Sequence, residues 1–240
     1  MHPTTIDSVF NGSIRVKQHR DGYRFSIDAF LIADFVRPAP DDTVLDLGAG
    51  CGIIALILAR RYPRLKIFGV EVQPELALLA QENAAENGMG SRISILHMDL
   101  KELTRDCFAT PIDVIVSNPP FRRQTSGRVN PHPQRAIARH EIRLTLEDLA
   151  RVSAMILDPG GRFAVVYPAE RLTGLLSILH KWRIEPKVLR LVHSHREGDA
   201  IRVLVEGVKE GRPGVRIRRP LTVYSRDGRY TPEAAALFSP

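Results

Sequence analysis

The residues best suited to bind a cofactor are an acid and three glycines that follow an apolar run. Residues 43–47 are mostly apolar and include Asp46, and a loop with Gly48, Gly50 and Gly52 comes next. Residues 53–60 then have the apolar spacing of a helix. Glycines let the backbone approach a ligand closely, and the N–H groups at a helix start can face it. This strand, loop and helix predict a nucleotide-type binding site.

Two more acids follow later apolar runs. Residues 67–71 end at Glu71, roughly twenty residues past the glycine loop, where a carboxylate can accept hydrogen bonds from two ribose hydroxyls. Residues 93–97 lead to Asp99, which is placed to meet an adenine amino group. Taken singly, each acid is equally well explained as a capping or loop residue. Their order along the chain indicates one nucleoside pocket, and the G-x-G-x-G spacing disfavours a hydride-transferring dinucleotide.

Asn-Pro-Pro-Phe, at positions 118–121, has the more specific chemistry. Residues 112–117 form an expected strand that carries Asn118 to its carboxyl end, where open α/β sheets bind ligands. The Asn118 side-chain oxygen and the Pro119 carbonyl can accept hydrogen bonds from a planar amino group, and they favour the tetrahedral nitrogen that attacks a methyl group. Phe121 is expected to stack on the acceptor. A simple strand-ending turn is the alternative for this motif.

These motifs together resemble the Rossmann-like S-adenosylmethionine-dependent methyltransferases. The resemblance implies an α/β fold, with helices on both faces of a seven-stranded sheet whose last strand is antiparallel. It implies S-adenosyl-L-methionine as the cofactor, bound through Asp46, Gly48, Gly50, Glu71 and Asp99, with Asn118, Pro119 and Phe121 at the methyl acceptor. No metal is expected to take part.

The amino-terminal residues narrow the resemblance. Residues 21–33 precede the glycine loop by one helix, and Asp28 is expected either to cap that helix or to contact the ligand. This segment, residues 139–141 and Pro220-Leu221 resemble the bacterial tRNA adenosine N6-methyltransferases that modify valine tRNA beside the anticodon. Many relatives are expected to have a second aromatic residue after the position of Phe121. This chain has Arg122 there instead. The resemblance implies tRNA as the substrate.

Other acceptors share the Asn-Pro-Pro-aromatic motif. Ribosomal RNA guanine N2-methyltransferases and enzymes that methylate a release-factor glutamine remain alternatives, ranked second and third. Both usually carry an additional amino-terminal domain, and only about forty residues precede the first core strand here. A catalytically inactive RNA-binding module is the non-enzyme alternative.

The charge of the chain favours a polyanionic partner. Its 240 residues have a formal net charge of +7, and its isoelectric point is near 9.8. No acid occurs between Pro119 and His140, a glycine- and proline-containing stretch that is expected to form a loop beside the catalytic motif. A second basic cluster lies near the carboxyl terminus, at positions 212–219. The arginines of the first stretch that are expected to hold RNA phosphates are Arg122, Arg123, Arg128 and Arg139.

The length suits one methyltransferase domain over residues 1–240. Residues 1–40 are expected to cover the cofactor, and residues 209–240 form a basic extension. The expected later elements are a helix at 145–157 capped by Thr145, a strand at 162–167, a helix at 170–181, and strands at 187–192 and 201–208. Two cysteines and the lack of a long apolar stretch predict a cytoplasmic protein without a membrane segment.

Overall fold

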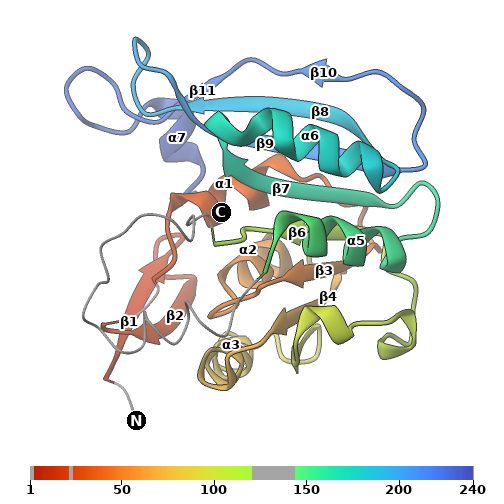
Figure 1. The fold of residues 1–240 in the computed structure, drawn as a ribbon. Helices are drawn as coiled ribbons and strands as arrows, with labels where there is room; N and C mark the ends of the chain where they lie inside the picture. Colours follow the sequence, from red (N-terminus) through yellow and green to blue (C-terminus); the bar gives the residue numbers. More distant parts are fainter. Residues whose placement is uncertain (1–2, 22–23, 121–143, 240) are drawn as a thin grey trace.

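A mixed β-sheet with helices on both faces forms the centre of the molecule (Figure 1). The computed structural model describes residues 3–21, 24–120 and 144–239. In order across the sheet, the strands are β10 (Arg216–Ile217), β8 (Ile184–His193), β9 (Ala200–Lys209), β7 (Arg162–Pro168), β6 (Val114–Ser117), β3 (Thr43–Leu47), β4 (Lys66–Glu71) and β5 (Ile93–His97), and β11 (Leu221–Thr222) pairs with β8.

The direction of the strands confirms the expected fold class. Strands β7, β6, β3, β4 and β5 pair in parallel, and β9 runs antiparallel to both β7 and β8. These seven long strands are the predicted seven-stranded sheet, with the last of them in sequence reversed. The two-residue strands β10 and β11 extend it along β8 and were not expected.

Alternating side chains of the strands pack against two helical layers. Val114 and Val116 of β6 belong to the core cluster shared with α1 (Ile27–Phe35), α2 (Ile53–Arg61) and α3 (Pro74–Glu86). Ile115, between them, belongs to the cluster shared with α5 (Leu146–Ile156) and α6 (Leu172–Lys181). This is the two-residue period of a strand buried on both faces. The short elements are η1 (Leu100–Glu102), η2 (Arg105–Cys107), η3 (Ala169–Arg171) and α7 (Pro232–Ala236).

Several predicted boundaries shift in the structure. The Thr145 cap of α5 is confirmed, because Thr145 and Asp148 exchange the hydrogen bonds of a capping box. The helix expected at 170–181 begins only at Leu172, after the 3-10 turn η3, and β8 starts at Ile184, three residues earlier than expected. Near Asp227-Gly228 a single bridge joins Tyr224 and Tyr230, and Leu221–Thr222 pairs with β8.

An amino-terminal hairpin, β1 (Thr4–Val9) and β2 (Ile14–His19), was not predicted. Its turn includes Asn11 and Gly12 at positive φ, which is the backbone that an Asn-Gly pair favours. Asn83 of α3 holds the hairpin: its Oδ1 accepts from Lys17 N at 2.8 Å, and its Nδ2 donates to the carbonyl oxygens of Lys17 and Cys51, both at 2.9 Å. One buried amide thus joins the hairpin to the glycine loop.

The expected capping role of Asp28 is wrong. Ser26 is the N-cap of α1, and its hydroxyl accepts from Asp28 N at 3.2 Å. Asp28 occupies the second helical position, where its negative charge still suits the helix dipole. Its buried carboxylate accepts instead from Arg202 Nε of β9 at 3.2 Å, a contact between residues far apart in the sequence.

Candidate active site

The glycine loop after β3 adopts a backbone that other residues rarely take. Gly48, Gly50 and Gly52 have φ angles of 81°, 56° and 85°. A Cβ at Gly48 or Gly50 would meet no atom within 4 Å, so these two positions leave space on the outer side of the loop. At Gly52 a Cβ would lie 3.2 Å from the Ala80 Cβ, which shows that α2 and α3 approach closely there. The loop can therefore present its backbone to a ligand.

Asp46 is the most unusual polar residue at this edge of the sheet. Its exposed fraction is 0%, and neither carboxyl oxygen has a hydrogen-bond partner in the described part of the chain. Burial, and then the charge of Glu71, raise the pKa of Asp46 to about 8. A buried carboxyl group of this kind fits a ligand that donates hydrogen bonds or carries a positive charge, as S-adenosylmethionine does.

Glu71, at the end of β4, connects the glycine loop with the start of α3. Its Oε2 accepts from Gly50 N and its Oε1 accepts from Gln73 N, both at 2.9 Å. Burial raises the pKa of Glu71, and the hydrogen bonds from Gln73 and Gly50 oppose that rise. Each carboxylate oxygen has a second lone pair, so both can still accept a ligand hydroxyl.

Asp99 lies just past β5, the next strand of the sheet. Its Oδ1 accepts from Lys101 N at 2.9 Å, which makes it the N-cap of η1. Asp46, Glu71 and Asp99 therefore belong to three neighbouring parallel strands and lie at or just past their carboxyl ends. The pattern of the sequence anticipates this arrangement.

Asn118 and the glycine loop line the same cleft. Asn118 directly follows β6, the neighbour of β3, and the Ser117 hydroxyl before it donates to Leu47 O at 2.7 Å. That buried hydrogen bond fixes the end of β6 against β3. The side chain of Asn118 is half-buried, and Pro119 is buried. The other residues that line the cleft are Phe25, Ala29, Gly48, Ala49, Gly50, Cys51, Ile53 and Ile54.

Phe25 is a cleft residue that sequence reasoning missed. It precedes α1 and packs against Phe30, with ring centroids 6.0 Å apart. Its position is consistent with the prediction that residues 1–40 cover the cofactor. The other predicted site residues, Phe121, Arg122, Arg123, Arg128 and Arg139, lie outside the described residues.

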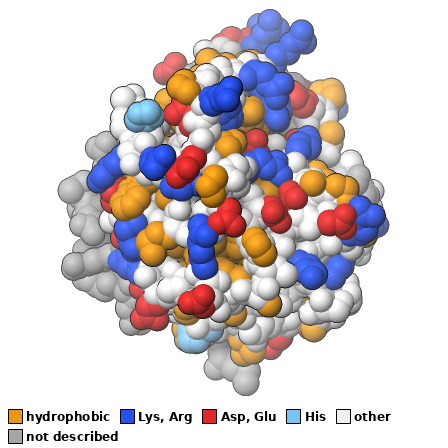
Figure 2. All heavy atoms as spheres, turned by 90° about the vertical axis from the view of Figure 1, so that its right-hand side faces the viewer, with side chains coloured by type: hydrophobic (Ala, Val, Ile, Leu, Met, Phe, Trp, Pro, Cys, Tyr) orange, Lys and Arg blue, Asp and Glu red, His pale blue; other side chains and the backbone are white. Residues whose placement is uncertain are grey.

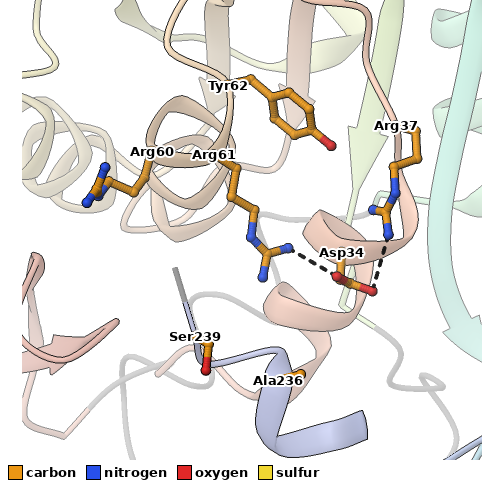
Figure 3. A pocket seen from close by; sticks show the side chains of 7 residues that line it. All are labelled: Asp34, Arg37, Arg60, Arg61, Tyr62, Ala236 and Ser239. Atoms are coloured by element: carbon orange, nitrogen blue, oxygen red, sulfur yellow. Dashed lines mark hydrogen bonds and ion pairs between the residues drawn. The ribbon is translucent and has the colours of Figure 1, made fainter.

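A second, larger cavity of about 430 Å³ lies away from this cleft. The cavity is lined by residues at the carboxyl-terminal ends of α1 and α2, by Ala236 of α7 and by Ser239 (Figure 3). In the described ranges, no group of three or more His, Cys, Asp or Glu side chains could hold a metal ion. No helix within those ranges is long and apolar enough to cross a membrane.

The raised pKa of Asp46 predicts a pH-dependent stability. Between its unfolded value of 3.8 and about 8, the folded carboxyl is protonated while the unfolded one is ionised. Folding then takes up a proton, so the free energy of unfolding falls as pH rises through this window and levels above it. Asp46→Asn stays neutral, and we expect its stability relative to the wild type to rise by a few kcal/mol from pH 4 to pH 8. Urea unfolding at several pH values measures this difference, and the exposed Asp41→Asn is the control. A constant difference between wild type and Asp46→Asn would refute the assignment.

Comparisons with known proteins identify the family of the chain. The model of the methyltransferase small domain matches residues 27–181. A tRNA1(Val) (adenine(37)-N6)-methyltransferase from Porphyromonas gingivalis is 32% identical over 229 residues, which cover 90% of this chain and 88% of the relative.

Two solved structures share the fold. A predicted O-methyltransferase from Agrobacterium tumefaciens aligns with a TM-score of 0.70 at 22% identity, covering 88% of this chain and 94% of the other. A geranyl diphosphate methyltransferase in complex with S-adenosylmethionine aligns with a TM-score of 0.53 at 15% identity, covering 75% and 84%. The chain therefore belongs to the methyltransferase small domain family of S-adenosylmethionine-dependent enzymes.

Proposed function

We propose that this chain transfers the methyl group of S-adenosylmethionine to N6 of adenine 37 in tRNA1(Val). The observation that carries the proposal is the common cleft of Asn118 and the glycine loop, because it brings an acceptor-binding amide beside the expected cofactor site. The relative from Porphyromonas gingivalis, a tRNA1(Val) (adenine(37)-N6)-methyltransferase, supports the choice of acceptor.

The chemistry requires a weak nucleophile to be made reactive. When bound, the cofactor supplies an electrophilic methyl group on a positively charged sulfur. Asn118 Oδ1 and the Pro119 carbonyl accept hydrogen bonds from the adenine amino group and favour its tetrahedral form. The nitrogen lone pair would take the methyl group as its bond to sulfur breaks, which would leave S-adenosylhomocysteine, and the nitrogen would release one proton to water. The two prolines limit the movement of these acceptors before the reaction.

The same proposal assigns the cofactor to the strand-end acids. Glu71 accepts hydrogen bonds from the ribose hydroxyls, Asp99 meets the adenine of the cofactor, and Asp46 lies beneath the glycine loop as a buried acceptor. Gly48 and Gly50 allow the close approach of the backbone. Asp28 does not cap α1, and its carboxylate accepts a hydrogen bond from Arg202 Nε instead. A direct contact between Asp28 and the cofactor stays a prediction.

Mass spectrometry of nucleosides distinguishes the possible acceptors. Bulk tRNA and rRNA are incubated with the protein and isotope-labelled cofactor, then digested. We expect labelled N6-methyladenosine from tRNA. Labelled N2-methylguanosine from rRNA would support the guanine alternative, and label on a release-factor glutamine would support the protein alternative. Label on no substrate would support an inactive RNA-binding module.

The acid-free stretch after Asn-Pro-Pro carries a separate prediction. We expect replacement of Arg122, Arg123 and Arg128 by alanine to weaken tRNA binding and leave cofactor affinity unchanged. Each lost phosphate contact should flatten the dependence of log Kd on log salt by roughly 0.7 to 0.9. Fluorescence anisotropy over a salt series measures this slope. Unchanged tRNA affinity and slope would remove these arginines from the RNA interface.

A further inference from the structure

The segment from Gly211 to Arg226, which comes shortly after β9, is rich in arginine. Between Gly211 and Arg226 the sequence contains no aspartate or glutamate. Part of this segment forms β10 at the outer edge of the sheet, beside β8. Lys and Arg side chains gather toward the top of Figure 2, at the height of β8 and β10 in Figure 1. The arginines of the segment are Arg212, Arg216, Arg218, Arg219 and Arg226.

Two anchors hold this segment in place. Arg218 N donates to Leu189 O of β8 at 2.8 Å, and the Arg218 guanidinium lies over the Phe35 ring of α1, 5.0 Å from its centroid. Arg216 and Arg219 are exposed on either side of it. Ile217, between them, is 67% exposed. The segment therefore displays arginines from a fixed backbone rather than burying them.

The segment lies against a further arginine, Arg190 of β8, whose Nε donates to Arg219 O at 3.1 Å. Burial lowers the pKa of Arg218, and the charges of Arg216, Arg37 and Arg190 lower it further. Glu206 is the acid that opposes this effect. We call Arg37, Arg190, Arg216, Arg218 and Arg219 the arginine tract. Within the tract, Arg190 is ion-paired with Glu233 and Arg37 with Asp34, whereas Arg216 and Arg219 are exposed to a polyanion.

The tract continues across the helical face of the molecule. Arg37 also lines the cavity of about 430 Å³, together with Arg60 and Arg61. Figure 3 shows Asp34 between Arg37 and Arg61, with ion-pair distances of 3.8 and 3.4 Å. Arg60 points away from Asp34 in the same view. A basic surface thus extends from β10 past the end of α1 to the end of α2.

The tract is too far from the acceptor cleft to hold the methylated nucleotide itself. Four strand spacings separate β10 from β6, which carries Asn118. At about 4.8 Å per spacing, this is about 20 Å. A group bound here therefore belongs to another part of a large substrate.

We propose that the arginine tract binds the phosphate backbone of the tRNA substrate outside the nucleotide that is methylated. This inference rests on the proposed function. Guanidinium groups spread along an extended edge match a series of phosphates better than one small anion. Pairing of β10 with a second copy of the chain is disfavoured, because it would bring two sets of these arginines together.

The test removes two exposed arginines and keeps the anchor on Phe35. The variant is Arg216→Ala with Arg219→Ala, and its matched control is Arg64→Ala with Arg183→Ala. The control loses the same charge from exposed ion pairs elsewhere, with Asp41 and Glu210. We expect the Kd of the tract variant for tRNA to rise roughly tenfold or more at 0.1 M salt, and its salt slope to fall by about 1.5. The control should change both quantities little.

Four further measurements separate the possible outcomes. Cofactor affinity, melting temperature and sedimentation should be unchanged in the tract variant, and saturating tRNA should restore its kcat. If the wild type methylates tRNA and the tract variant has an unchanged Kd and salt slope, the proposed role of the tract is wrong and the proposed function stands. A wild type that methylates only a protein would overturn both. A changed oligomeric state would point to contact between copies instead.

Discussion

Asn118→Ala is expected to lose nearly all methyl transfer while it keeps cofactor affinity within a few-fold of the wild type. The residue is half-buried after β6 and lines the cleft opposite the glycine loop. Its side-chain oxygen is assigned to the amino group of the acceptor, so its loss raises the barrier of the chemical step. Removing one preorganised hydrogen-bond partner commonly costs a hundredfold or more in rate. Single-turnover methylation of tRNA at saturating cofactor measures this loss.

Two controls make the Asn118 experiment specific. Asn118→Asp keeps an acceptor oxygen in the same place, and we expect it to retain a measurable part of the rate. Ser117→Ala instead removes the hydrogen bond to Leu47 O, which should lower stability more than it lowers the rate of the folded enzyme. Wild-type turnover in Asn118→Ala would show that this amide does not act on the acceptor. Equal losses in the alanine and aspartate variants would indicate a purely structural role.

The main parts of the fold are predictable because their signals are local. Apolar runs and their spacing locate β3, β4, β5 and β7 to within one residue, and Thr145 with Asp148 locates the start of α5. The acids at the strand ends follow from the same patterns. Parallel strands place their carboxyl ends at one edge, so three acids in sequence order become neighbours in space.

The features that were missed depend on contacts between distant residues. Ser and Asp are both good caps, and in the structure Ser26 caps α1 while the Asp28 carboxylate contacts Arg202 of β9. Asn83 reads as an ordinary helical residue until β2 folds against it. Phe25 enters the cleft only after α1 packs beside α2. The Asn11-Gly12 pair is the local sequence signal for the amino-terminal hairpin.

Glu71→Ala is expected to weaken cofactor binding by roughly one to two orders of magnitude, the scale of one or two charge-assisted hydrogen bonds. The Glu71→Ala substitution removes an acceptor from two kinds of donor, backbone N–H groups and ligand hydroxyls. Its oxygens already accept from Gly50 N and Gln73 N, and their remaining lone pairs are assigned to the ribose hydroxyls. Calorimetric titration with S-adenosylhomocysteine measures the affinity. Glu86→Ala, which removes an exposed carboxylate from the far end of α3, is the control.

A ribose analogue separates recognition from support of the loop. If Glu71 binds the hydroxyls, the wild type should lose affinity for an S-adenosylhomocysteine analogue that lacks one of them, and Glu71→Ala should lose little more. If Glu71 only supports the glycine loop, the two losses should add, because the hydroxyl would then have another partner. Additive losses would therefore remove Glu71 from the ribose site even if the variant binds the cofactor weakly. Unchanged cofactor affinity in Glu71→Ala would exclude both roles. The hydrogen bonds that Glu71 accepts from Gly50 N and Gln73 N would then not be needed for the shape of the loop.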